Sequence, residues 1–122
     1  MSNIVKLVVN DQPMLQFDRN IAIPKEQKAF LMQMEIKMSG GIQLANEWIE
    51  KPDLMQKAQF VALNLLEYIE QENFTKAIAL FTYIVESLSD LQQLNAKGSS
   101  SNFKVEFVFD EDFHQWQEVK FS

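Results

Sequence analysis

Two short apolar segments at the start of the chain are separated by turn residues. Residues 4–9 are mostly β-branched, which is typical of a strand. Turn residues occupy positions 10–13, and residues 14–18 then alternate, with Leu15 and Phe17 on one face. The pattern predicts an N-terminal β-hairpin. Because residues 4–9 are apolar on both faces, their strand is expected to be central in a sheet or covered by another subunit.

Residues 25–38 carry a helical stripe of apolar positions. Pro24 suits a first helical turn, and no breaker follows before Gly40-Gly41. An alternative exists for Gln33–Leu44, since apolar residues also alternate there and Gly-Gly can turn a hairpin. The abundance of Met, Glu, Lys and Gln favours a helix that ends at the glycines. The stripe consists of Phe30, Met34 and Met38.

The central part of the chain predicts two more helices. Residues 46–51 are expected to form a short helical turn or irregular segment that presents Trp48 and ends before Pro52. Apolar positions at helical spacing then predict a helix over residues 54–69. A further helix is predicted from the N-cap Asn73 to Ala96, ended by Lys97-Gly98 and followed by a flexible, polar connector over residues 99–102.

The C-terminal part predicts strands. Residues 103–109 alternate cleanly between apolar and mostly polar side chains, which indicates a strand with one buried face. Residues 114–121 are expected to form a final strand or a short helix that exposes Trp116. Since an isolated hairpin is marginally stable, the strands from the two ends of the chain should meet. Residues 1–122 are therefore predicted to be a single α+β domain, with a small antiparallel sheet packed on about three central helices.

Composition limits the possible chemistry. A chain of 122 residues with 47% hydrophobic residues is long enough for one packed core. The absence of cysteine removes disulfides and thiolate metal sites, which fits a reducing compartment. Neither a signal peptide nor a membrane-spanning helix is predicted. A soluble, cytoplasmic protein is expected.

The charge distribution argues against direct nucleic-acid binding. The net charge is −6, and the eleven Lys and Arg residues, with Arg19 the single arginine, are scattered along the chain. An acidic surface favours a basic partner and raises the alternative of a nucleic-acid mimic. With one histidine and three glycines, the sequence has no nucleophile elbow, P-loop or dinucleotide motif. A non-enzymatic protein is therefore predicted.

An acidic segment after the C-terminal strand is the candidate metal site. Asp110, Asp112 and His114 offer two carboxylates and an imidazole, which suit a divalent cation. The favoured reading is a solvated turn, because such residues are ordinary turn chemistry and the spacing matches no calcium loop. No cofactor is expected beyond this possible ion.

Methionines and aromatic residues are the candidates for a protein interface. Met-bearing helix faces adapt to different partners, and aromatic side chains are enriched at interfaces, although both kinds of residue also fill cores. The sequence predicts a protein-interaction or regulatory domain that forms a homodimer, and it leaves open a second protein as partner. The candidate interface residues are Met34, Met38, Trp48, Phe103, Phe107, Phe109 and Trp116.

The order of the predicted elements resembles that of one known group. A hairpin whose turn begins with Val9-Asn10-Asp11, followed by Pro-started helices, looks like the layout of phage tail-assembly chaperones. The resemblance implies an assembly chaperone as an alternative function. The aromatic strand over residues 103–109 departs from that layout.

Overall fold

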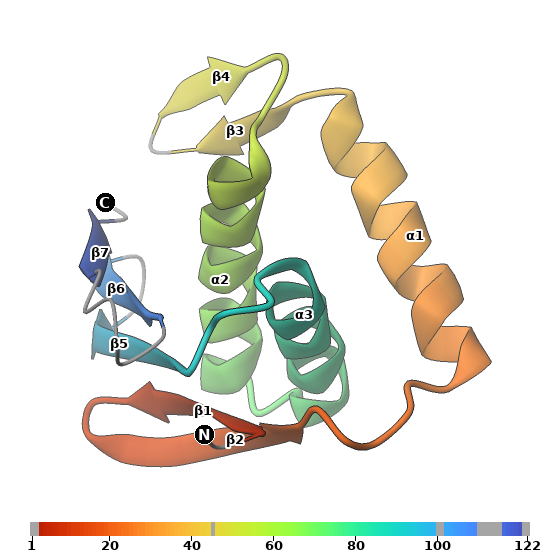
Figure 1. Cartoon of the computed structure of the whole chain (residues 1–122). Helices are drawn as coiled ribbons and strands as arrows, with labels where there is room; N and C mark the ends of the chain where they lie inside the picture. Colours follow the sequence, from red (N-terminus) through yellow and green to blue (C-terminus); the bar gives the residue numbers. More distant parts are fainter. Residues whose placement is uncertain (1–2, 45, 100–101, 110–115, 121–122) are drawn as a thin grey trace.

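The computed structural model describes residues 3–44, 46–99 and 102–109, and the backbone of residues 116–120. In these ranges a sheet, a middle layer of two helices and an outer helix follow one another, with a small hairpin at one end (Figure 1). The elements are β1 (Ile4–Val9), β2 (Gln12–Asp18), α1 (Lys25–Ser39), β3 (Ile42–Leu44), β4 (Glu47–Ile49), α2 (Leu54–Glu70), α3 (Phe74–Ser87), β5 (Gln93–Ser99), β6 (Asn102–Val108) and β7 (Trp116–Lys120).

The main sheet joins the two ends of the chain. Its described strands have the order β2-β1-β5-β6-β7, and Leu7 of β1 is paired with Leu94 of β5. The α+β class is confirmed, and so is the central position of β1. The prediction of an antiparallel sheet is wrong in one respect, because β1 and β5 are parallel. The reason is topological: the chain crosses over through the helices before it returns to the sheet beside β1.

The strand β5 replaces the end of a predicted helix. The prediction of a helix from Asn73 to Ala96 is wrong beyond residue 87, where α3 ends. Residues 93–99 form a strand between β1 and β6, in which Leu94 and Ala96 are buried. Backbone pairing with a strand on each side stabilises residues 93–99 as a strand, and this outweighs the tendency toward a helix that the spacing of the leucines indicates. The predicted connector is also much shorter than expected, because Ser99 and Asn102 are already paired strand residues.

A second correction concerns the segment after α1. Residues 47–49 form strand β4, which pairs with β3, and not a helical turn. The helical interpretation of residues 25–38 is confirmed, and α1 ends just before the two glycines. Gly41 has φ +116°, and a Cβ at this position would overlap the indole of Trp48. A glycine is therefore required where the hairpin leaves the helix.

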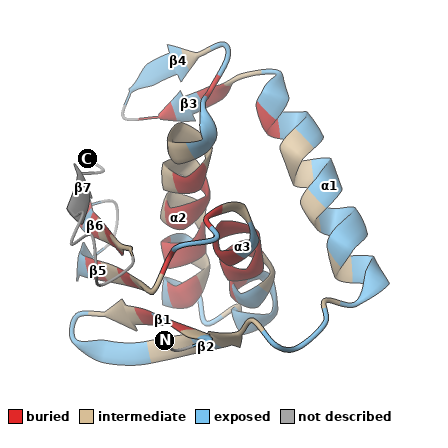
Figure 2. Ribbon diagram, viewed as in Figure 1, coloured by how far each residue is buried: buried red, intermediate tan, exposed pale blue. Residues whose placement is uncertain are grey.

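The core lies between the sheet and the layer formed by α2 and α3 (Figure 2). Apolar residues of β1, β5 and β6 point toward the buried faces of these two helices. Asp53 and Gln56 form a capping box at the start of α2, and Asn73 caps α3, as predicted. The largest fully buried side chains include Leu7, Leu65, Phe81, Ile84, Leu94 and Phe107.

Arg19 connects the end of β2 to the end of α3. Its guanidinium donates hydrogen bonds to the backbone carbonyls of Val85 (3.0 Å), Leu88 (3.1 Å) and Leu91 (2.9 Å). These carbonyls lie in the last turn of the helix and in the segment leading to β5, where backbone acceptors lack helical partners. A positive charge at this end of a helix is also favoured by the helix dipole.

Candidate functional site

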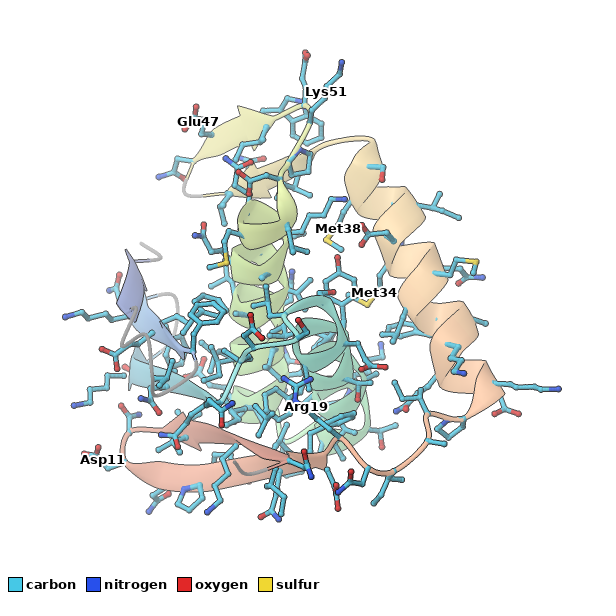
Figure 3. The ribbon with its side chains drawn as sticks, in the orientation of Figure 1. Asp11, Arg19, Met34, Met38, Glu47 and Lys51 are labelled. Carbon is cyan, nitrogen blue, oxygen red and sulfur yellow. The ribbon has the colours of Figure 1, made fainter. Side chains whose placement is uncertain are left out.

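The outer helix α1 has two apolar faces. Its inner face carries Met34 and Met38, which point from α1 toward α2 and α3 (Figure 3). Its outer face carries Met32 and Ile36, whose side chains are 66% and 69% exposed. Together with the exposed Ala29, these two residues form a stripe at spacing i, i+3, i+7, which we call the outer stripe. The outer stripe is therefore a candidate for an interaction surface.

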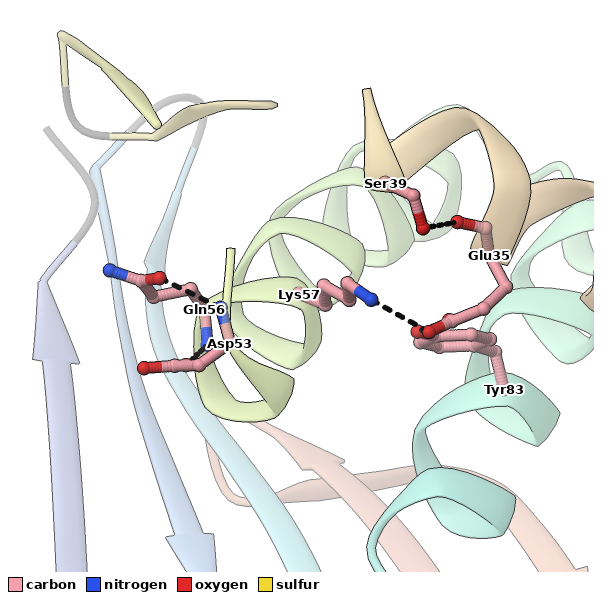
Figure 4. Close-up of polar contacts among 6 residues, drawn as sticks. All are labelled: Glu35, Ser39, Asp53, Gln56, Lys57 and Tyr83. Carbon is pink, nitrogen blue, oxygen red and sulfur yellow. Dashed lines mark hydrogen bonds and ion pairs between the residues drawn. The ribbon is translucent and has the colours of Figure 1, made fainter. Parts of the chain in front are cut away.

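The inner face is fixed to the middle layer by Glu35. Its carboxylate accepts a hydrogen bond from Lys57 Nζ at 2.7 Å and one from the hydroxyl of Tyr83 (Figure 4). The hydrogen bond from Lys57, followed by that from Tyr83, lowers the pKa of Glu35 against the opposing effect of burial. Burial raises the pKa of Tyr83, and the hydrogen bond to Glu35 adds to the shift. These contacts tie α1 to both α2 and α3.

This contact predicts a pH dependence of stability. Because the pKa of Glu35 is lower in the folded protein than in the unfolded chain, its contribution is present near neutral pH and is lost on acidification through the folded pKa. The free energy of unfolding of the wild type should therefore exceed that of Glu35→Gln at about pH 7, and the difference should shrink toward about pH 3. Urea denaturation at both pH values, at one protein concentration, measures it. A difference that is constant with pH would contradict the role of the carboxylate.

A cavity lies between α1 and α2. It has a volume of about 310 Å³, and Leu80 of α3 and Ile42 of β3 contribute to its lining. A more open hollow of about 480 Å³ adjoins it and shares Met34, Lys37 and Tyr68. The α1 wall is formed by Phe30, Met34 and Met38, and the α2 wall by Phe60, Asn64 and Tyr68. Both sets have the spacing i, i+4, i+8, so one ridge of side chains from each helix borders the cavity.

The predicted interface residues fall into different parts of the fold. Met34 and Met38 meet at the cavity, where Met38 is buried and Met34 half-buried. Phe103 and Phe107 are enclosed by the core, and Phe109 packs at its edge. The side chain of Trp48 is 58% exposed on β4. Trp116 begins β7 in the edge position of the sheet, and its side chain is outside the described part.

The candidate metal residues Asp110, Asp112 and His114 lie outside the described residues. Within the ranges that the structure does describe, no three His, Asp, Glu or Cys side chains come together as a metal site requires. Across the same ranges, no helix has the length and apolar character needed to cross a bilayer.

Sequence reasoning missed the outer stripe and Lys37. Ala29, Met32 and Ile36 do follow a helical spacing, but a second apolar stripe on the opposite face hides it.

Comparisons of the chain with protein-family models, with curated proteins and with solved structures find no match.

Proposed function

We propose that this protein is a non-enzymatic, cytoplasmic protein-interaction domain that acts as a homodimer through the outer stripe of α1. The observation that carries the proposal is the exposure of Met32 and Ile36 on the outer side of a helix that is anchored on its inner side by the buried Met38 and by the contacts of Glu35. Removing these side chains from water would stabilise an assembly by about 25 cal/mol for each Å² of apolar area buried.

The charges of α1 support a second copy of the same helix as the partner. Glu26 and Lys37 lie on one side of the outer stripe, and Lys28 and Glu35 lie on the other, as the helical periodicity requires. Both pairs share a midpoint between Leu31 and Met32. In an antiparallel pair of α1 helices with its twofold axis at this midpoint, each acidic residue faces a basic residue of the partner. Such self-complementarity is what an isologous interface needs.

The geometry of this pairing places the apolar residues together. Met32 lies beside the axis and would contact its own copy, whereas Ile36 would pack near Ala29 of the partner. Ion pairs at the rim contribute little to affinity, and their effect is to select the antiparallel orientation. The pair that includes Glu35 is the weaker of the two, since both of its carboxylate oxygens already accept hydrogen bonds, from Lys57 and Tyr83, although its side chain remains 46% exposed.

The test is the molar mass in solution. The wild type should have twice the chain mass of 14.2 kDa in light scattering at micromolar concentration. Ile36→Lys should weaken the dimer by at least about 100-fold, because two lysines would be buried without partners at the interface. Ile21→Lys is the matched control, since Ile21 is 67% exposed and lies outside α1. A monomeric wild type, or equal effects of the two substitutions, would contradict the proposal.

A further inference from the structure

The cavity between α1 and α2 has the composition of a small-molecule site. Its volume of about 310 Å³ lies at the lower end of the range of ligand pockets, about 300–1,000 Å³. Most of its lining is apolar, from Met34, Met38, Ile42, Phe60 and Leu80. Methionine side chains adjust their shape to a bound chain more easily than branched side chains do. Such a cavity accommodates a flexible aliphatic group.

The mouth of the cavity is positively charged. Among the described residues that line the cavity and the adjoining hollow, Lys37 is the one that carries a charge. A second cation is close by, because Lys76 Nζ lies 5.4 Å from the ring centroid of Tyr68, another lining residue. Asn64 and Tyr68 add hydrogen-bonding groups on the α2 wall. An anionic head group is the chemistry that complements this end.

We propose that the cavity binds an aliphatic carboxylic acid of medium chain length as its anion. The chain lies among Met34, Met38 and Phe60, with Leu80 as part of the floor, and the carboxylate interacts with Lys37. Burial of each methylene is worth about a fourfold gain in affinity. Affinity should therefore rise about fourfold per methylene from hexanoate to octanoate and level off once the chain fills the cavity.

The cavity faces α2, whereas the outer stripe faces away from the fold, and Ile36 and Lys37 lie between them because both also line the adjoining hollow. Ligand binding does not depend on the dimer, and the two proposals can fail separately. Lys37 belongs to both, since it lines the cavity and would face Glu26 of the partner helix. The variant Glu26→Gln separates these roles, because it removes the same predicted ion pair between helices and leaves the cavity lining unchanged.

The experiment is isothermal titration of the full chain with octanoate, 1-octanol and octylammonium. Octanoate should bind at least about tenfold more tightly than octylammonium, because the charge at the mouth selects the head group. Lys37→Gln should abolish this preference, whereas Glu26→Gln should retain it. Light scattering of both variants under the same conditions reports the dimer independently. Absence of octanoate binding at about 10 mM, or a preference that survives in Lys37→Gln, would overturn the proposal.

A cavity-filling variant tests the position of the chain. Asn64 is a half-buried lining residue, and its Nδ2 donates a hydrogen bond to the carbonyl of Phe60 in the preceding turn at 3.0 Å. Asn64→Phe would place a ring in the cavity from its exposed side, so the fold should be retained, as circular dichroism can verify. Octanoate affinity should fall at least tenfold in this variant. A folded Asn64→Phe protein with unchanged octanoate affinity would place the chain elsewhere and overturn the assignment.

Discussion

Phe107→Ala is expected to lower the free energy of unfolding by about 3–5 kcal/mol, the range measured for truncation of buried aromatic side chains. Phe107 is fully buried in β6, where its backbone neighbours are Leu94 of β5 and Gln117 of β7. Its ring fills the space between the sheet and the helices, and that space cannot collapse without moving paired strands. The decrease in the free energy of unfolding therefore has two parts, the transfer free energy that burial of the ring contributes and the cost of the cavity that remains.

The measurement for Phe107 is urea denaturation followed by circular dichroism at one protein concentration. Val108→Ala is the control, because Val108 is the next residue of the same strand, faces the other side of the sheet and is half-buried. Val108→Ala should lower the free energy of unfolding by about 1 kcal/mol or less. A folded Phe107→Ala protein with nearly unchanged stability but a reduced molar mass would contradict the core assignment and favour an interface role.

Arg19→Ala is expected to lower the free energy of unfolding by about 2–4 kcal/mol, because the guanidinium makes three charge-assisted hydrogen bonds to carbonyls that are partly buried. Without it, the carbonyls of Val85, Leu88 and Leu91 lose a donor at the place where α3 ends and the chain turns toward β5. Arg19→Lys should restore only part of the loss, because an ammonium group cannot reproduce the planar fork that reaches three acceptors.

Thermal and urea denaturation of the two Arg19 variants would measure these effects. Lys25→Ala is the matched control for removal of a cation, because Lys25 is exposed at the start of α1. Its effect should stay within about 0.5 kcal/mol. An equal, small effect of Arg19→Ala and Lys25→Ala would show that the contacts of Arg19 do not stabilise the fold.

Local patterns predicted most of the elements. Helix α2 and strand β6 have a strong period of 3.6 and two residues, strand β1 is a short β-branched segment, and each was predicted close to its observed bounds. β5 was missed because its residues resemble the end of a helix and become a strand only by pairing with β1 and β6. β3 and β4 have three residues each, too few to show a period.

The candidate site was predicted less completely than the fold. Met34 and Met38 were identified from their spacing in the helix, and the structure places them at the cavity. Phe103 and Phe107 were selected for their aromatic character, which core and interface residues share, so only burial in the fold distinguishes the two roles. Lys37 lines the cavity because α1 and α2 border it together in the fold, which no local pattern shows.

The antiparallel pairing of α1 is the central claim, and cysteine cross-linking tests it most directly. The chain has no cysteine, so Met32→Cys introduces one thiol beside the proposed twofold axis, where the two copies approach closely enough for a disulfide. Lys51→Cys, exposed and outside α1, is the control for random collision. Under mild oxidation at micromolar concentration, Met32→Cys should convert rapidly to a covalent dimer while Lys51→Cys remains mostly monomeric. Equal rates of cross-linking for the two variants would contradict the dimer.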